Sequence, residues 1–364
     1  YNPSHFENLY KNDQREVGNT ILDLAVLLWA ENDPNIKSLL WDWCRLAIAK
    51  DSWGNNLDLE ISHLLFGLSI TYDWYKDSLP DDLRKGIREF IYQHTNSQYA
   101  FAKLQVGWWT RSYWQNHCWI KYTSILASGL ALSRDYPEAK EWVKFAESQI
   151  KMIIDVQPPY GSNQEGLNYS VYGTLWLVRS LAILEDQGED LFTQSKYLEN
   201  YYKYYQAFSV DENLDTFFDV GDSPRFLWYS PAEIFAKLGQ KYNSQEYEDL
   251  YSFYRFKVKK PKAGLMSAVY SLPKGSLNLL TKDLDHIYIQ DIGVYSEKIL
   301  RKNFVVNSFF FKSGIAGGRW AHEMSAKDPS LRLNRSHSHP DQNHFIVWTP
   351  KGFLISDTGN SKKS

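Results

Sequence analysis

The sequence predicts a multidomain α + β protein, with an N-terminal α/α toroid followed by an antiparallel β-sandwich domain. Up to residue 256, apolar side chains recur at helical spacing in one segment after another. After residue 264 the apolar runs are short, β-branched and aromatic. A basic stretch with proline and glycine, residues 255–264, separates the two patterns. We therefore expect domains at 1–256 and 257–364, the second being the start of a β-sandwich that is cut short at its C-terminus.

Ten helices are expected in the first domain, each with apolar residues at i, i+3, i+4 and i+7. The fourth helix follows Pro80 and opens with two aspartates, a common start signal. Short connections imply antiparallel hairpins, and enough hairpins in series can close into a toroid. The expected helices cover residues 20–32, 36–50, 58–77, 80–94, 117–134, 137–155, 168–187, 196–209, 230–241 and 245–256.

Four runs in the second domain are expected to form strands, because β-branched and aromatic residues stand between turn residues. In the last run, "TPKG" separates two apolar stretches and predicts a hairpin turn. The runs are "GLMSAVYSL" (264–272), "HIYIQDIGVYSE" (286–297), "NFVVNSFFFKSG" (303–314) and "NHFIVWTPKGFLISDTG" (343–359).

Composition excludes several classes of protein. The chain has 364 residues, 43% of them hydrophobic, which is enough to bury a large core. A net charge of −3 provides no basic excess for neutralising nucleic-acid phosphates. No apolar run is long enough to span a membrane, and we expect that any signal peptide has been removed from this chain or was never there. The two cysteines, Cys44 and Cys118, are expected to be buried apolar residues on helices.

Aromatic residues make up 16% of the chain, and some of them are expected to line a binding cleft. Their faces stack on sugar rings, while their polar tips can hydrogen-bond. In "GWWTRSYWQNHCW" (107–119), four tryptophans alternate with polar residues, which would be a wasteful composition for a core. Candidate substrate-binding residues in this stretch are Trp108, Trp109, Arg111 and Trp114.

The stretch "RSHSHPDQNHF" (335–345) holds three of the nine histidines. On an extended segment His337 and His339 face the same side, because side chains alternate with a period of two. Asp357 follows the last apolar run, and a hairpin would return it beside this pair. His339 and Asp357 are therefore candidate metal ligands. His344 precedes an apolar strand and is expected to be structural.

Two further loops carry polar groups suited to acid-base chemistry. "YWQNHCW" supplies Asn116 and His117, and "PYGSNQEGLNYSVYG" supplies Tyr169, with Glu165 and Tyr172 as candidate substrate-binding residues. Together with His337, these groups could cleave a uronic-acid polysaccharide by β-elimination. Asn116 or a protonated histidine could neutralise the C5 carboxylate; His117, His337 or Tyr169 could remove the C5 proton; and Tyr169 could protonate the leaving O4.

These segments carry a resemblance to the heparinase II/III-like polysaccharide lyases, and within that superfamily to the dermatan sulfate epimerase type. It covers nearly the whole chain and includes "TYDWYKDSLPDDLRKGIREF", "YWQNHCW", "EGLNYSVY" and "HSHPDQNHFIVWTPKGF". By this resemblance His117, Tyr169 and His337 occupy catalytic positions. His339 and Asp357 match two ligands of a structural divalent metal, zinc or manganese, that orients the His337 loop. The third family ligand lies beyond the end of this sequence.

The resemblance implies an acidic polysaccharide as partner, glycosaminoglycans before alginate, and therefore an extracytoplasmic location. Cations in the cleft must then bind carboxylates or sulfates. The candidates are Arg111, Lys121, Arg225, Arg319 and Arg335. Two glycosylation sequons, at Asn168 and Asn334, lie in the proposed catalytic loops and are expected to be unmodified.

Four functions compete at this stage. A lyase and a C5-epimerase share the removal of the C5 proton, and the lyase is favoured because that activity is commoner in the superfamily. A glycoside hydrolase would instead need two carboxylates, with Glu165, Asp219 and Asp222 as candidates. An inactive carbohydrate-binding protein would show a damaged catalytic set, and no damage is visible.

Overall fold

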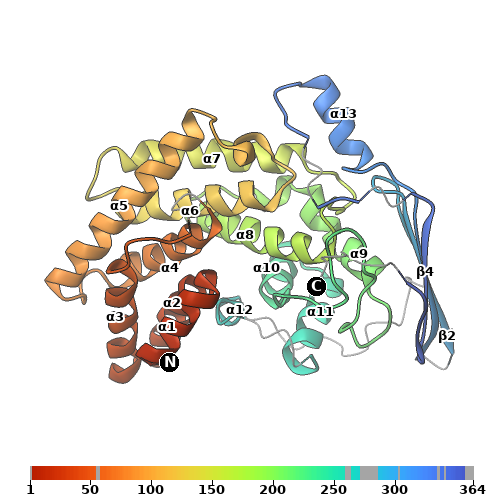
Figure 1. Cartoon of the computed structure of the whole chain (residues 1–364), viewed down its shortest axis with the longest axis horizontal. Helices are drawn as coiled ribbons and strands as arrows, with labels where there is room; N and C mark the ends of the chain where they lie inside the picture. The colour runs from red at the N-terminus through yellow and green to blue at the C-terminus, as the bar shows by residue number, and fades with distance from the viewer. Residues whose placement is uncertain are drawn as a thin grey trace.

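The computed structural model describes residues 2–54, 58–258, 264–270, 286–301, 304–333, 337–339 and 342–356. A helical domain is followed by an antiparallel sheet, as predicted (Figure 1). The helices are α1 (Pro3–Asn12), α2 (Gln14–Glu31), α3 (Pro34–Ile48), α4 (Leu59–Tyr75), α5 (Asp81–Lys103), α6 (Asn116–Leu132), α7 (Ala139–Val156), α8 (Leu167–Asp186), α9 (Lys196–Phe208), α10 (Ala232–Tyr242), α11 (Gln245–Phe256), α12 (Met266–Val269) and α13 (Arg319–Lys327). The strands are β1 (His286–Ile289), β2 (Val294–Arg301), β3 (Phe304–Lys312), β4 (His344–Thr349) and β5 (Gly352–Ile355).

The helical domain has two layers. The inner helices contact one another in the order α2, α4, α6, α8, and α3, α5 and α7 lie outside them. Helices α4, α6 and α8 are buried on nearly every side, whereas α5 and α7 bury one face. An all-round apolar helix belongs inside a helical assembly and an amphipathic one at its surface. This is the double-layered arrangement expected of an α/α toroid.

Each of the ten predicted helices is present, because the apolar periodicity that predicts a helix is local to its segment. Helix α3, for example, starts where Asp33 caps the backbone N–H of Asn35 and Pro34 occupies the first turn. The run at 264–272 was predicted as a strand, and this is wrong: α12 forms there and packs on α2 and α10. A short apolar run does not distinguish a strand from a buried helical turn.

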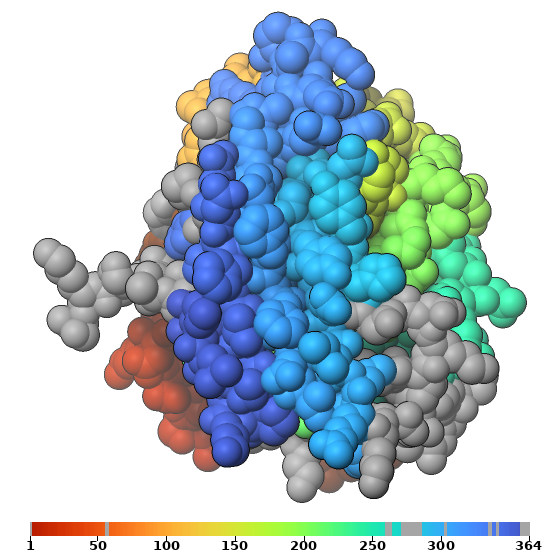
Figure 2. All heavy atoms as spheres, turned by 90° about the vertical axis from the view of Figure 1, so that its right-hand side faces the viewer, coloured from red at the N-terminus to blue at the C-terminus, as the bar shows by residue number. Residues whose placement is uncertain are grey.

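The five strands form one antiparallel sheet in the order β1-β2-β3-β4-β5. The predicted hairpin at "TPKG" is confirmed as the turn between β4 and β5. On the inner face, Phe310 contacts Phe208 and Phe218 of the helical domain, with ring centroids 5.1 and 4.8 Å apart. The second sheet of a sandwich is not among the described residues, and aromatic side chains such as Phe311 and Phe345 remain exposed on the outer face, which Figure 2 views.

Hydrogen bonds tie the sheet domain to the helices. The buried Asp291, between β1 and β2, accepts from the hydroxyl of Ser162 at 2.7 Å and from the backbone N–H of Trp320 at 2.6 Å. The Trp320 indole donates to the carbonyl of Val156 at the end of α7, at 2.9 Å. These contacts hold the loops of the two domains against each other, where the candidate site lies. Across the described residues, no helix has the length and apolar character needed to cross a membrane.

Candidate active site

The N-terminal ends of the four inner helices meet at one end of the helical domain. The Nε of Arg15, in α2, lies 3.3 Å from Oε1 of Glu60 in α4. Asp58, which caps α4, lies 3.6 Å from Nε2 of His117 in the first turn of α6. The segment before α8 reaches the same place by hydrogen bonds to Asn116. Because helix N-termini carry partial positive charge, this end of the domain favours anionic groups.

Glu165, just before α8, is a buried carboxylate that binds the start of α6. It accepts from the backbone N–H of Asn116 at 2.7 Å and from the side-chain amide of Asn116 at 3.0 Å. Burial raises the pKa of Glu165 to about 8, although the Asn116 hydrogen bonds oppose the shift. Gly166, at φ +83°, makes the turn into α8, and a Cβ there would meet the Ser223 hydroxyl at 2.5 Å. This turn places Glu165 between α6 and α8.

Asp222 holds both histidines of the "HSH" segment. Its Oδ2 lies 2.9 Å from Nδ1 of His337, and its Oδ1 lies 2.9 Å from Nε2 of His339. The two rings therefore face the same side, as their spacing predicted. Ser338 points the other way and accepts from the backbone N–H of Gly317 at 3.1 Å. Burial lowers the pKa of His337, with the Asp222 hydrogen bond opposing the shift, so its imidazole is neutral at pH 7.

Tyr169, in the first turn of α8, stacks on His337. The ring centroids are 3.6 Å apart and the planes are 14° from parallel. The ring of Trp228 meets Tyr169 edge-on at 4.9 Å. Burial, together with the negative charges of Asp222 and Glu165, raises the pKa of Tyr169. The phenol is therefore protonated at neutral pH and able to donate.

His117 lies on the other side of the site. Its ring packs against Trp108, with centroids 4.9 Å apart. Burial lowers the pKa of His117 to about 4, although Asp58 raises it. His117 is therefore neutral at pH 7, which does not match the expectation that a protonated histidine could neutralise a substrate carboxylate.

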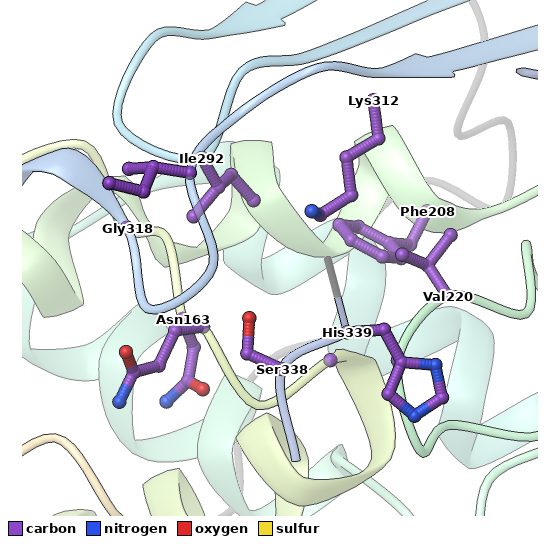
Figure 3. A pocket seen from close by; sticks show the side chains of 12 residues that line it. Asn163, Phe208, Val220, Ile292, Lys312, Gly318, Ser338 and His339 are labelled. Carbon is purple, nitrogen blue, oxygen red and sulfur yellow. The ribbon is translucent and has the colours of Figure 1, made fainter. Parts of the chain in front are cut away.

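A small cavity of about 10 Å³ lies behind the "HSH" segment, at the boundary between the domains. Figure 3 shows Lys312 reaching from β3 toward Ser338, whereas the His339 ring points away from the Ser338 hydroxyl. The volume suits about one water molecule, so this cavity is too small for a sugar ring.

The tryptophan-rich stretch is only partly a surface. Trp108 is 49% exposed, whereas Trp109 and Trp114 are 4% and 3% exposed. The Trp114 indole donates to the carbonyl of Val156 at 2.8 Å, and the Lys121 ammonium lies over the Trp109 ring at 5.1 Å. The expectation that Trp109 and Trp114 line a cleft is wrong, because both side chains are buried in the core. Burying a large apolar side chain is favourable even when its neighbours in the sequence are polar.

Tyr172 lies one helical turn beyond Tyr169 and is buried. Its hydroxyl is 2.6 Å from Nε2 of His63, and its ring stacks on Tyr229 at 5.0 Å. It borders a cavity of about 310 Å³ inside the helical domain, whose wall also carries the buried ion pair of Arg179 and Glu233. Tyr172 is therefore a buried residue of the helical domain, and these contacts do not include Tyr169 or His337.

The arginine and lysine residues predicted to bind the substrate lie in different parts of the structure. Arg319 is exposed in the first turn of α13, and Arg111 is half-buried at the end of a short 3₁₀ helix, Trp108–Arg111. Arg225 pairs with Asp219 at 2.9 Å, and Lys121 is 1% exposed. Arg335 and Asp357, predicted to bind substrate and metal, lie outside the described residues, as does Asn334.

Asn168 belongs to the other sequon, and both polar atoms of its side chain form hydrogen bonds within the protein. Its side-chain amide donates to the carbonyls of Pro224 and Phe226, and its Oδ1 accepts from the backbone N–H of Trp228. These bonds fix the loop that carries Asp222 and Trp228 against α8. A glycan on this nitrogen is incompatible with them.

The described residues do not by themselves form a metal centre. His339 has Asp222 as its carboxylate neighbour, and no group of three or more histidine, cysteine, aspartate or glutamate side chains within the described ranges could hold an ion. The metal predicted at His339 and Asp357 stays a prediction.

Three residues of this site were not predicted in their present positions. The sequence indicates Asp222 only as a possible hydrolase acid, and it does not single out Asp58 or Arg15. Asp58 could have been found as the capping residue one position before a helix. Arg15 carries no local signal, because a basic residue in the first turn of a helix is ordinarily a solvated surface group.

No family model matches this chain, and no curated protein matches its sequence. Its fold matches solved polysaccharide lyase structures. A crystal structure of heparinase III superposes with a TM-score of 0.60 at 11% identity, covering 92% of this chain and 49% of that structure. A mutant of the heparan sulfate lyase HepC from Pedobacter heparinus gives a TM-score of 0.53 at 15% identity, covering 92% of this chain and 47% of that structure.

A heparinase III gene product gives a TM-score of 0.56 at 13% identity, covering 92% of this chain and 50% of that structure. The chain therefore spans about half the length of the structures it matches and has the fold of that half. The predicted resemblance to heparinase-like polysaccharide lyases is confirmed at the level of the fold.

Proposed function

We propose that this chain carries the catalytic residues of a polysaccharide lyase that cleaves a uronic-acid-containing glycosaminoglycan by β-elimination. The observation that carries the proposal is the face-to-face contact of Tyr169 and His337, with Nδ1 of His337 held by Asp222. The two residues come from different domains, 168 positions apart in the chain. A proton donor and a proton acceptor are thereby held together at the positively charged ends of the inner helices.

The protonation states suggest how the work is divided. A neutral His337 whose Nδ1–H is bound to Asp222 has an unprotonated Nε2, which can accept the C5 proton. Tyr169, whose pKa is raised, can donate its phenolic proton to the departing O4. Negative charge that develops on the substrate carboxylate as C5–H breaks would be stabilised by the converging helix N-termini.

The acids suited to a glycoside hydrolase are otherwise engaged. Asp219 pairs with Arg225, Asp222 lies between two imidazoles, and Glu165 binds Asn116. Since a hydrolase needs two carboxylates directed at the scissile bond, these contacts favour elimination. A C5-epimerase uses the same first proton transfer and remains the alternative.

The proposal includes an acidic polysaccharide substrate, an extracytoplasmic place of action, and a bound metal ion with His339 as one of its ligands. The metal takes no part in the proposed proton transfers. Metal analysis of the purified protein and of His339→Ala tests it directly: equal metal content in both would remove His339 as a ligand.

The deciding experiment incubates the protein with chondroitin, dermatan, hyaluronan, heparan and alginate chains in deuterated water. Ultraviolet absorbance of unsaturated uronate identifies a lyase and its substrate. Deuterium at C5 without cleavage identifies an epimerase. New reducing ends with neither signal would identify a hydrolase and contradict the proposal.

A further inference from the structure

The proposed elimination needs a group that binds the acidic substituent of the sugar, and three of the groups predicted near His117 for this task are not available to an anion. The Asn116 amide donates to Glu165. His117 is neutral, because burial lowers its pKa to about 4. Lys121 is 1% exposed and lies over Trp109. Meanwhile the carboxylates of Asp58 and Asp222 add negative charge, so an anionic substrate needs a further cation at this site.

We infer that Arg15 binds an anionic substituent, carboxylate or sulfate, of the sugar that is held between His117 and Tyr169. This inference rests on the proposed function and adds to it a residue that recognises the substrate. Arg15 lies in the first turn of α2, about 100 positions before His117 in the chain.

Two chains of contacts place Arg15 between the catalytic candidates. On one side, its Nε lies 3.3 Å from Glu60, two residues after the Asp58 that approaches His117 to 3.6 Å. On the other side, the positive charge of Arg15 acts on the phenol of Tyr172, three residues after Tyr169 in α8, and opposes the rise that burial causes in the pKa of Tyr172. Residues three apart lie on the same face of a helix, so Tyr169 and Tyr172 share one face of α8.

The electrostatics of the site agree with this placement. The positive charge of Arg15 lowers the pKa of Tyr169 and of His117, each by a smaller amount than burial and the nearby carboxylates contribute. Arg15 is thus one of the charges that act on both groups, as we expect of a residue that binds an anion between them.

Arg15 also has the exposure and the spare donors that a binding residue needs. Its side chain is 39% exposed, in contrast with the buried Lys121. A guanidinium has five N–H donors in a planar fork that can bind carboxylate or sulfate oxygens in pairs. Glu60 and Tyr172 engage only part of this fork, and they hold it in place without the entropy loss of ordering a free side chain.

The test compares Arg15→Met, Arg15→Lys and the control Arg84→Met on the substrate that the wild-type chain cleaves. Arg84 is a half-buried arginine of the outer helix α5, paired with Asp81, and its side chain is 40% exposed, close to the 39% of Arg15. We expect kcat/KM to fall on the order of 10²-fold in Arg15→Met and about 10-fold in Arg15→Lys, because lysine keeps the charge but loses the fork. Arg84→Met should match wild type, and unchanged kcat/KM in Arg15→Met would overturn the inference.

A binding measurement separates this inference from the proposed function. Titration calorimetry on His337→Ala, with and without Arg15→Met, would use a heparan sulfate octasaccharide and its desulfated and carboxyl-reduced forms. If Arg15→Met weakens only ligands that carry carboxylates, the partner is the carboxylate; if it weakens only sulfated ones, it is the sulfate. Equal binding with and without Arg15→Met overturns the inference alone. No binding of any form by His337→Ala contradicts heparan sulfate as the substrate, and the same titration with an octasaccharide of the chain that wild type cleaves then decides the inference.

Glu60→Gln provides a second variant in case Arg15→Met does not fold. Removing the negative charge beside Arg15 should tighten octasaccharide binding several-fold by leaving the guanidinium less neutralised. Weaker or unchanged binding in Glu60→Gln would count against Arg15 as the anion-binding group.

Discussion

Tyr169 and His337 stack face to face, 3.6 Å apart, although one starts an inner helix and the other belongs to the sheet domain. Neither domain contains the proposed proton donor and acceptor by itself. Activity should therefore depend on how the "HSH" segment docks on the helical domain, where Gly221 lies against the backbone of His337.

Gly221→Ala should lower activity by disturbing the backbone of His337. Gly221 has φ +65°, and a Cβ there would meet the His337 carbonyl oxygen at 2.7 Å. Displacing a catalytic group by about 1 Å can cost on the order of 10²-fold in rate, and we expect at least a 10-fold loss of kcat/KM.

Gly188→Ala is the matched control for this prediction. Gly188 has φ +93°, and a Cβ added there would meet nothing within 4 Å, so both variants carry left-handed backbone strain of about 1–2 kcal/mol but only one meets an obstacle. Urea unfolding should show the strain cost in both variants and a larger destabilisation in Gly221→Ala, whose Cβ meets the His337 carbonyl. Equal activities of the two variants would mean that the Gly221 contact does not position His337.

Asp222→Asn should reduce kcat without unfolding the protein. The carboxylate holds the Nδ1–H tautomer of His337, and an asparagine amide can present its NH₂ group instead, which favours the wrong tautomer. Loss of such an orienting carboxylate reduces kcat on the order of 10²–10⁴-fold in comparable sites. Steady-state kinetics would show it, with the exposed Asp215→Asn as control; a change under about 3-fold would refute the orienting role.

Glu165 should make stability depend on pH. Its pKa is raised from 4.5 to about 8 in the folded state. Between these values the folded chain binds more protons than the unfolded one, so the stabilising contribution is complete below about pH 4.5 and is lost as the pH rises through about 8. The slope is about 1.4 kcal/mol per pH unit within this window.

Glu165→Gln removes this titration. Relative to the variant, wild type should lose free energy of unfolding between pH 5 and 8, as measured by urea denaturation across that range. The exposed Glu141→Gln should follow wild type. Parallel pH profiles of wild type and Glu165→Gln would show that Glu165 is ionised in the folded protein at neutral pH.

Replacing one partner of the ion pair between Arg179 and Glu233 should strongly reduce the free energy of unfolding. Its atoms lie 2.7 and 2.8 Å apart in a bidentate contact, with side chains 7% and 3% exposed. Arg179→Met leaves a buried carboxylate without its partner and should cost about 3–5 kcal/mol of unfolding free energy. Arg45→Met, which breaks an exposed pair with Asp42, should cost under about 1 kcal/mol. A cost below about 1 kcal/mol for Arg179→Met would mean that the carboxylate finds another partner or a proton.

Much of the fold was predictable because the controlling interactions are local. Apolar spacing predicted the ten helices, and the alternation of an extended segment predicted that His337 and His339 share one side. The strand predicted at 264–272 is wrong because the short apolar run packs as one helical turn between α2 and α10, a contact that depends on distant residues.

The sequence by itself determined which residue types could carry acid-base chemistry, namely Tyr169, His117 and His337. Tertiary structure decided their protonation states and their partners. The buried Glu165 accepts hydrogen bonds from Asn116, Asp222 binds His337, and α2 brings Arg15 to the same end of the domain. Burial and charge set these states, and both depend on what lies nearby in space. A residue's neighbours in space come from anywhere in the chain, whereas periodicity and capping are read from neighbours in sequence.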